Sequence, residues 1–101
     1  MTKKIVTLAG DGIGPEIMAA GLEVLEAVAN KIGFDYDIDA KPFGGAGIDA
    51  CGHPLPKDTL DATKAADAIL LAAIGGSKYD NATIRPEQGL LAIRKELNLF
   101  A

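Results

Sequence analysis

The hydrophobic pattern of the chain predicts three strands. Residues 5–9 are apolar without alternation, and residues 67–74 are likewise apolar after Asp67, which is typical of parallel strands buried on both faces. Residues 34–41 instead alternate between apolar and charged positions. This alternation and the nearby Pro42 favour an edge strand with one packed and one solvent-exposed face. The packed face would carry Phe34, Tyr36, Ile38 and Ala40.

A long helix is predicted between the first two strands. Pro15 and Glu16 suit the first turn of a helix, and Gly33 is a natural terminator, so the helix should cover residues 15–32. Its apolar stripe, at helical spacing, consists of Met18, Leu22, Leu25, Val28 or Ala29, and Ile32.

Two further helices are predicted later in the chain. The first covers residues 56–66, and the second begins at Pro86 after a polar loop over residues 77–84. The glycine-rich segment 43–47 breaks the pattern of the preceding strand, and residues 48–55 read as a loop.

The element order βαβαβα predicts an α/β fold of three layers, with a parallel sheet and right-handed helical crossovers. The half-polar strand belongs at an edge and the first strand in the middle, so the expected spatial order is 2-1-3. The third strand would form the other edge although it is apolar on both faces, which invites a further strand. We therefore expect residues 1–101 to be an incomplete portion of one larger domain.

Composition limits the kind of partner. The chain has 101 residues, 49% of them hydrophobic, and a net charge of −4, which argues against nucleic acid or an anionic membrane as the main partner. Its longest apolar run is too short to span a bilayer. One cysteine excludes an internal disulfide, so a reducing cytoplasm is the expected compartment.

One predicted helix carries a chemically mixed face. Within residues 85–98, Glu87, Leu90 or Leu91, and Arg94 recur at three- and four-residue intervals and therefore share a face. A carboxylate, an apolar pair and a guanidinium in one line suit a small acid with an apolar tail. The alternative is the solvated flank of a helix whose inward-facing residues are Leu90, Ile93 and Leu97.

The glycine turn at residues 10–14 lies between a strand and a helix, where dinucleotide folds hold a pyrophosphate. The fingerprint G-x-G-x-x-G fails here, because the third glycine position is Pro15 or Ile17, depending on which glycine begins the pattern. We therefore expect a tight turn with some ligand contact rather than a Rossmann-type phosphate site.

The loop from Gly75 to Glu87 is a second candidate site. Because it follows a strand, it should lie with the glycine turn at the carboxyl end of the sheet, where ligands bind in open α/β folds. Gly75 and Gly76 would allow a close approach to the backbone, and charge and an aromatic ring come from Lys78, Tyr79 and Asp80. The alternative is an ordinary polar loop.

Two other clusters of polar residues are not expected to bind metal. Cys51 and His53 are only two ligands, whereas a zinc site needs three or four. The aspartates of residues 35–39 lack the glycine turn and distal glutamate of a calcium loop, so they should form a solvated edge.

Four segments together resemble the isocitrate/isopropylmalate dehydrogenase family, which also includes homoisocitrate and tartrate dehydrogenases. The resemblance extends over the whole chain and is carried by residues 10–16, 55–60, 66–76 and 85–95. Isocitrate enzymes of this family place a serine and an asparagine where Leu90 and Leu91 stand. The leucine pair instead suits the isopropyl group of 3-isopropylmalate.

The resemblance implies an oxidoreductase of leucine biosynthesis that oxidises 3-isopropylmalate with NAD and then decarboxylates it with the help of Mg²⁺ or Mn²⁺. By this analogy, Arg94 binds a substrate carboxylate, and Leu90 and Leu91 line the isopropyl pocket. Glu87 reaches the nicotinamide end of the cofactor, and Ile13 borders the cofactor. The remaining cofactor contacts would be Gly75, Gly76, Ser77, Lys78, Tyr79 and Asp80. Ser77 and Tyr79 depart from the proline and tryptophan usual in the family.

The resemblance also implies what the chain lacks. The family's catalytic tyrosine and lysine, its metal-binding aspartates and most of its adenosine site would lie beyond Ala101, and so would the second domain that forms the family's homodimer. We therefore expect a truncated chain without catalytic or metal-binding residues, inactive alone and of open oligomeric state. Two alternatives remain: a stand-alone module that binds a nucleotide or small acid, and a structural chain that self-associates through its third strand.

Overall fold

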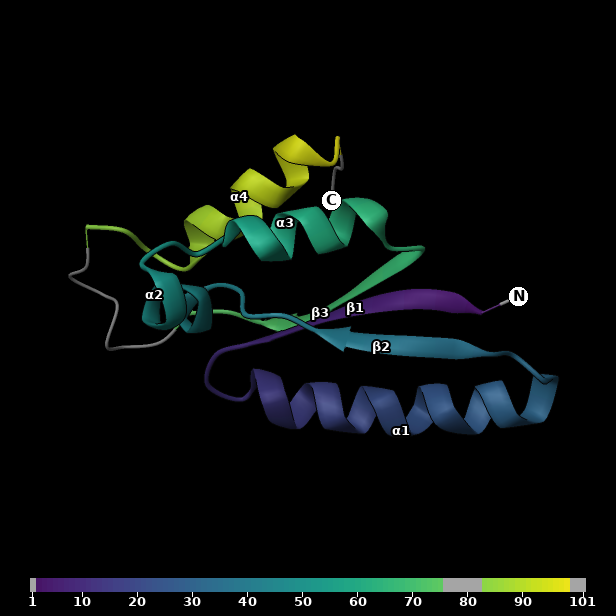
Figure 1. The fold of residues 1–101 in the computed structure, drawn as a ribbon. Coiled ribbons are helices and arrows are strands. Elements are labelled where there is room, and N and C mark those ends of the chain that lie inside the picture. Colours follow the sequence, from purple (N-terminus) through teal and green to yellow (C-terminus); the bar gives the residue numbers. More distant parts are fainter. Residues whose placement is uncertain (1, 76–82, 99–101) are drawn as a thin grey trace.

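The computed structural model describes residues 2–75 and 83–98, which form one parallel sheet with helices on both faces (Figure 1). The strands are β1 (Lys3–Gly10), β2 (Tyr36–Ala40) and β3 (Ala68–Ala73). Their spatial order is β2-β1-β3, and both pairings are parallel, with Ile5 opposite Ile38 on one side and opposite Ala68 on the other. The predicted order 2-1-3 is confirmed.

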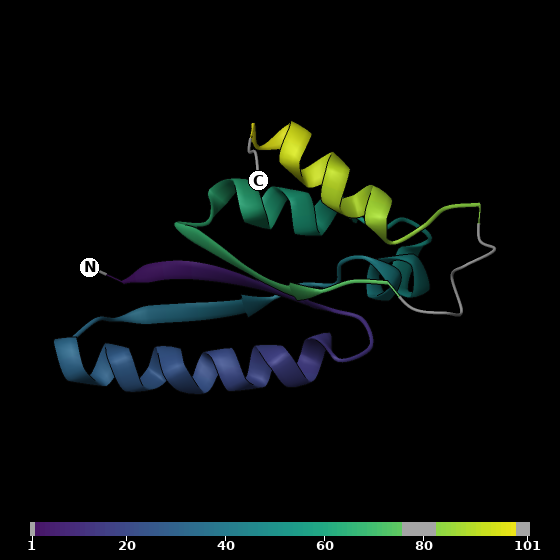
Figure 2. The same cartoon turned by 180° about the vertical axis from the view of Figure 1, so that it is seen from behind.

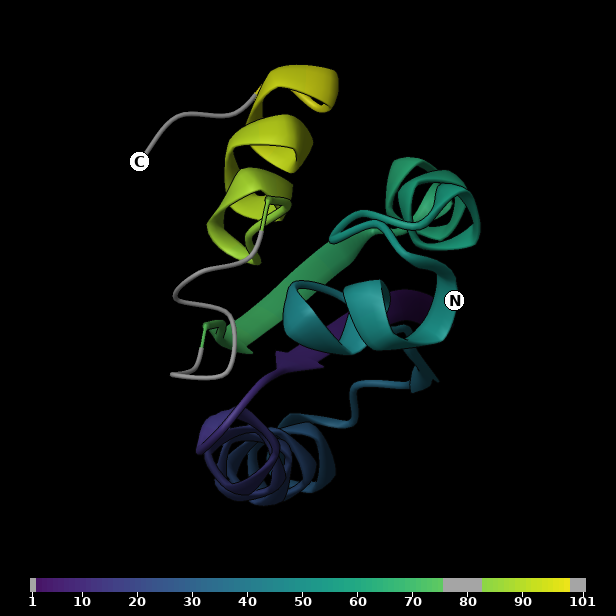
Figure 3. The ribbon, with the colours of Figure 1, turned by 90° about the vertical axis from the view of Figure 1, so that its left-hand side faces the viewer.

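The helices complete three layers. They are α1 (Gly14–Ile32), α2 (Gly45–Cys51), α3 (Lys57–Ala65) and α4 (Glu87–Glu96). α1 covers one face of the sheet, and α3 and α4 cover the other, as the view from behind also shows (Figure 2). Seen end-on, the sheet lies between these two helical layers, with α2 in front of the strand ends (Figure 3).

Helix α1 follows its predicted bounds closely. Pro15 lies in its first turn, and the helix ends at Gly33, whose φ of 71° places it in the left-handed region. Met18 and Ala29 are buried, as the predicted stripe requires, whereas Ile32 is 69% exposed. The prediction is wrong at Ile32 because α1 packs against β1 and β3, and its last turn extends beyond the start of β1 (Figure 1).

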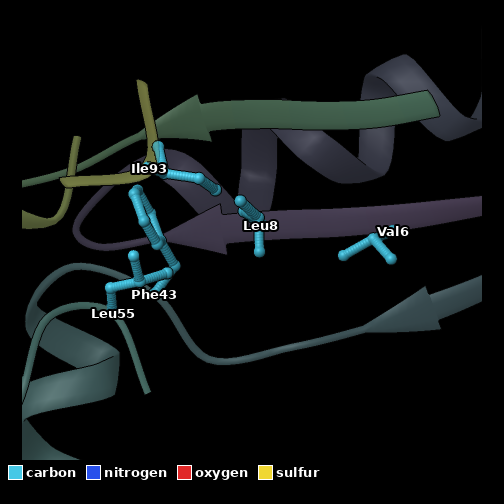
Figure 4. Packing of buried hydrophobic residues seen from close by; sticks show 5 residues of the cluster. All are labelled: Val6, Leu8, Phe43, Leu55 and Ile93. Atoms are coloured by element: carbon cyan, nitrogen blue, oxygen red, sulfur yellow. The ribbon is translucent and has the colours of Figure 1, made fainter. Parts of the chain in front are cut away.

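The core lies between the sheet and the α3–α4 layer. Its buried cluster combines side chains from β1, from the connections that flank α2, and from α4, namely Val6, Leu8, Phe43, Leu55 and Ile93 (Figure 4). Phe43 is fully buried. The Thr59 hydroxyl, also fully buried, donates a 2.7 Å hydrogen bond to the carbonyl of Pro42 and ties α3 to the segment after β2.

Helix α2 corrects the sequence analysis, which predicted a break at 43–47 and a loop at 48–55. The structure has a helix over Gly45–Cys51, closed by Gly52 in the left-handed region. Glycine has a low helix propensity, and the hydrophobic periodicity of this glycine-rich segment did not indicate a helix. The helix is stabilised from outside, because the carboxylate of Asp11 accepts hydrogen bonds from the first two N–H groups of α2.

The two edges of the sheet differ. At the β2 edge, Asp39 forms ion pairs with Lys4 at 3.8 Å and Lys41 at 3.7 Å. Ile38 was predicted to be packed but is 40% exposed, because α1 packs mainly over β1 and β3. The half-polar strand is nevertheless an edge strand, as expected.

The β3 edge is apolar and open. Within the described residues, no strand pairs with its outer side. A groove of about 380 Å³ runs between α1 and β3, and its lining includes Ile17, Val24, Val28, Leu70 and Leu71. The predicted burial of β3 on both faces is therefore only partial. None of the helices in the described part of the chain is long and apolar enough to cross a membrane.

Candidate functional site

The glycine turn after β1 and the end of β3 meet at the carboxyl end of the sheet, as predicted. The backbone N–H of Asp11 donates to the carbonyl of Ala73 at 2.8 Å, and the N–H of Gly75 donates to Asp11 Oδ2 at 2.9 Å. Gly10 and Gly75 have φ values of 77° and 99°, which favour glycine. A Cβ at Gly10 would also collide with the carbonyl of Ala73.

Asp11 is a structural residue that the sequence analysis missed. Besides Gly75, its carboxylate accepts hydrogen bonds from the N–H groups of Gly45 and Ala46, each at 2.7 Å. One side chain thus joins the β1–α1 turn, the start of α2 and the end of β3. The available signal was an aspartate between two glycines directly after a buried strand.

Glu87 lies beside Gly75, so these two predicted cofactor residues are brought together. A Cβ built on Gly75 would be only 2.8 Å from Glu87 Oε1, and Glu87 Oε2 accepts a hydrogen bond from Arg85 Nε at 3.2 Å. The glutamate occupies the first turn of α4, where its charge complements the helix dipole. The absence of a side chain at Gly75 makes this approach possible.

Ile13 belongs to the same end of the sheet. It precedes the first residue of α1, and its side chain is 64% exposed. Its neighbour Gly12 faces Gly75, because a Cβ at Gly12 would lie 3.8 Å from the Gly75 carbonyl oxygen. Gly12, which directly precedes Ile13, and the Glu87 carboxylate therefore both lie beside Gly75.

The two neighbouring leucines of α4 lie in different environments. Leu90 is half-buried and packs against the core together with Leu97, whereas Leu91 is 66% exposed. The inward-facing helix flank and the mixed face, which the sequence left as alternatives, therefore coexist on one helix. Leu91 lies four residues after Glu87 and three before Arg94, so these three share a face.

Arg94 is the cation of this face. Its side chain is half-buried, and it makes no hydrogen bond or ion pair with the described part of the chain. Arg94 lies seven positions after Glu87, which is about 10 Å along a helix axis. A partly desolvated guanidinium without a protein partner is suited to bind an anion such as a carboxylate.

Five predicted cofactor residues fall outside the described residues, namely Gly76, Ser77, Lys78, Tyr79 and Asp80. Their predicted contacts with the cofactor stay predictions.

A metal site is not formed by the described residues, among which no three His, Cys, Asp or Glu side chains are grouped to hold an ion. His53 Nδ1 accepts a 3.0 Å hydrogen bond from the Leu55 N–H, so the ring fixes the turn before α3. Cys51 is exposed, and its thiol lies 3.9 Å from the carbonyl of His53. His53 therefore has a local structural role in this turn.

The chain belongs to the isocitrate/isopropylmalate dehydrogenase family, whose sequence model matches residues 4–101. Among individual proteins, it is 85% identical to 3-isopropylmalate dehydrogenase of Streptococcus thermophilus over 101 residues, which are the whole of this chain and 29% of that protein. The enzyme of the same name from Lactococcus lactis is 71% identical over the same length. The chain thus spans about 29% of the length of these relatives.

Solved structures show the same fold. A β-decarboxylating dehydrogenase from Thermococcus kodakarensis, in its apo form, matches with a TM-score of 0.75 and 28% identity over 95% of this chain and 27% of that one. Isocitrate dehydrogenase from Methylococcus capsulatus matches with a TM-score of 0.59 and 35% identity over 74% of this chain and 22% of that one. The predicted family and fold class are both confirmed.

Proposed function

We propose that this chain supplies part of the substrate and cofactor pockets of an NAD-dependent dehydrogenase that oxidises and decarboxylates 3-isopropylmalate in leucine biosynthesis. The names of the relatives from Streptococcus thermophilus and Lactococcus lactis support this activity. Because the chain spans about 29% of their length, the complete activity requires residues that this chain does not contain.

The guanidinium of Arg94, half-buried and without a partner among residues 2–75 and 83–98, is the observation that carries the proposal. 3-Isopropylmalate is a dicarboxylate, and a guanidinium can hold one carboxylate through two parallel hydrogen bonds. Arg94 also shares its face of α4 with an exposed leucine, so one helix offers a carboxylate partner and an apolar surface. This combination distinguishes the site from an ordinary solvated helix flank.

The leucine pair selects the apolar part of the substrate. Leu91 offers an exposed aliphatic surface for the isopropyl group, and Leu90 fixes the position of α4 by packing against the core. A leucine cannot satisfy the extra carboxylate of isocitrate, which would be desolvated without a partner. The pair therefore favours 3-isopropylmalate over isocitrate.

The residues at the carboxyl end of the sheet fit the nicotinamide part of NAD. Ile13 presents an apolar surface to a ring, Gly75 leaves space, and the Glu87 carboxylate is an acceptor for a carboxamide N–H. NAD, when bound, would accept a hydride from the carbon that bears the substrate hydroxyl. We extend this cofactor role to residues 76–80 by the family resemblance alone.

The metal ion, the catalytic groups and the assembly of the family enter the proposal only as properties of the complete enzyme. The described residues offer no ligand set for Mg²⁺ or Mn²⁺, so we assign no metal-dependent step to them. No catalytic acid or base is assigned to this chain either. The complete enzyme would be a cytoplasmic homodimer, with neither nucleic acid nor membrane as a partner.

A chimera tests the proposal. This chain would replace the 101 matching residues of the Streptococcus thermophilus relative, and NADH production would be followed with 3-isopropylmalate and with isocitrate. We expect turnover with 3-isopropylmalate. Arg94→Ala should raise KM for this substrate about ten- to hundredfold, because a hydrogen-bonded charge pair contributes about 1.5–3 kcal/mol. Arg94→Lys should recover only part of the loss, since lysine cannot form the two-pronged contact.

Lys95→Ala is the matched control, because Lys95 is an exposed cation next to Arg94 on the same helix. It should leave KM unchanged. A chimera that prefers isocitrate, or an Arg94→Ala variant that behaves like Lys95→Ala, would contradict the proposal. The 101-residue chain alone should produce no NADH with Mg²⁺ or Mn²⁺, and measurable turnover would overturn its assignment as an incomplete catalyst.

A further inference from the structure

Asp11 binds three backbone N–H groups from two segments that are distant in the sequence. Oδ2 accepts from Gly45 at 2.7 Å and from Gly75 at 2.9 Å, and Oδ1 accepts from Ala46 at 2.7 Å. Hydrogen bonds to an ionised carboxylate are among the strong ones in proteins. Asp11 therefore acts as an internal anion that holds the start of α2 and the end of β3 against the β1–α1 turn.

This arrangement has a consequence for cofactor binding. Backbone N–H groups at helix starts and in positive-φ glycine turns are the groups that usually bind phosphate. Here the N–H groups of Gly45, Ala46 and Gly75 already have an acceptor within the chain. They are therefore not free for a pyrophosphate. The glycines of this end of the sheet thus serve internal packing.

The contacts continue from Asp11 to Glu87 through Gly75. The N–H of Gly75 is fixed by Asp11, and the other side of the same residue faces Glu87 Oε1, with 2.8 Å between that oxygen and a built Cβ. On the Asp11 side, Gly12 faces the Gly75 carbonyl and leads directly to Ile13. The Asp11 carboxylate therefore sets the distance between the turn that carries Ile13 and Gly75, beside which the Glu87 carboxylate lies.

We propose that Asp11 is a positioning residue for the nicotinamide end of the cofactor. It does not contact the cofactor but holds Gly75, whose backbone lies beside Glu87 Oε1, at a fixed separation from the turn that carries Ile13. This inference rests on the proposed function, because Ile13, Gly75 and Glu87 are cofactor residues only within that proposal. It assigns to Asp11 a role that the site residues themselves do not reveal.

NMR on the 101-residue chain tests the clamp itself, which is the set of three hydrogen bonds that Asp11 accepts from Gly45, Ala46 and Gly75. In the wild-type chain, a scalar coupling across the hydrogen bond should join the Gly75 nitrogen to the Asp11 carboxyl carbon, and this measurement needs no variant. In Asp11→Asn, the amides of Gly45, Ala46 and Gly75 should exchange about tenfold faster or more. The amide signal of Glu87 should also shift, although its side chain does not touch Asp11.

Asp61→Asn is the control for this measurement, because Asp61 is an exposed aspartate on α3 and should change none of these signals. If the coupling is absent, or if Asp11→Asn disturbs only Gly45 and Ala46, then Asp11 is merely a cap for α2 and the inference is wrong. The NMR experiment requires no bound cofactor.

The functional part is tested in the chimera described above. Asp11→Asn should raise KM for NAD about tenfold while KM for 3-isopropylmalate changes much less, because the hydrogen bonds of Asp11 end at Gly75, whereas Leu91 and Arg94 lie one and two turns beyond Glu87 on α4. Asp11→Glu, which keeps the charge on a longer side chain, should recover part of the loss. A parallel rise of both KM values, or no change in either, would overturn the positioning role. An unmodified chimera without NAD-dependent turnover would instead refute the proposed function, and the NMR result would then decide on the clamp.

Discussion

The Glu87 carboxylate lies directly against the backbone of Gly75, so that a Cβ on the glycine would be 2.8 Å from Glu87 Oε1. The contact joins the end of β3 to the first turn of α4, across the part of the loop that the structure leaves undescribed. The Glu87 side chain is half-exposed and can turn aside, so the φ of 99° is the stronger constraint on a side chain at Gly75.

Gly75→Ala should therefore lower the free energy of unfolding by about 1–3 kcal/mol, since the φ of 99° is unfavourable for alanine and the new methyl would meet Glu87. Urea unfolding followed by circular dichroism would measure the change. Gly21→Ala is the control, because Gly21 lies within α1 with no neighbouring atom within 4 Å of its Cβ position. It should stabilise the chain by about 0.5–1 kcal/mol. Equal effects of the two substitutions would contradict this account of Gly75.

The leucine pair should separate stability from specificity. Leu90→Ala should cost about 1–3 kcal/mol, less than for a fully buried leucine, whereas Leu91→Ala should change stability by no more than about 0.5 kcal/mol. In the chimera, Leu91→Ala should lower kcat/KM for 3-isopropylmalate about tenfold or more, as expected for lost methyl contacts in a substrate pocket. A stable Leu91→Ala variant with full activity would show that Leu91 does not contact the substrate.

Two buried threonines should differ in how much their hydroxyl groups contribute. Thr59→Val removes a hydrogen bond between α3 and the distant carbonyl of Pro42 and should cost about 1–3 kcal/mol. In Thr63→Val the lost bond is to Leu60 of the same helix, whose carbonyl has the usual backbone donor, so the cost should be smaller. Calorimetry or urea unfolding of both variants would rank them, and the reverse order would disprove this explanation.

The groove between α1 and β3 should bind an apolar fluorescent dye in the isolated chain. Val24 lines the groove and is 64% exposed, so Val24→Lys should weaken dye binding without unfolding the helix. Ile32 is similarly exposed on the same helix but outside the lining, so Ile32→Lys is the control and should have little effect. Sedimentation across a range of concentrations would show whether the same surface also drives association. Equal dye binding by both variants would argue against a defined groove.

The sheet could be predicted from the sequence because its strands differ in pattern. The continuous apolar run of β1 favoured a central position, and the alternation in β2 favoured an edge. The run of β3 is equally apolar although β3 forms the other edge of the described sheet. The carboxyl ends of parallel strands lie at the same edge of a sheet, so the glycine turn after β1 was expected to lie beside the end of β3. The structure confirms this expectation. The family motifs supplied the site residues, among which Gly75 and Glu87 are now seen in contact.

The features that were missed depend on contacts between distant residues. Helix α2 exists because Asp11 caps it from far away in the sequence, which no local pattern encodes. The exposure of Ile38 depends on where α1 crosses the sheet, and the different environments of Leu90 and Leu91 depend on the position of the core. Periodicity identifies the apolar positions of a helix or strand, but it does not say which of them another element covers.

The sequence separations spanned by the Asp11 carboxylate also have a kinetic meaning. Its three hydrogen bonds connect residues that are 34, 35 and 64 positions apart. Contacts of such long range close large loops and tend to form late in folding. During synthesis, the three hydrogen bonds of Asp11 can therefore be completed only after Gly75 has left the ribosome. In refolding experiments, loss of these bonds should accelerate unfolding more than it slows folding, so Asp11 would govern how long the finished site persists.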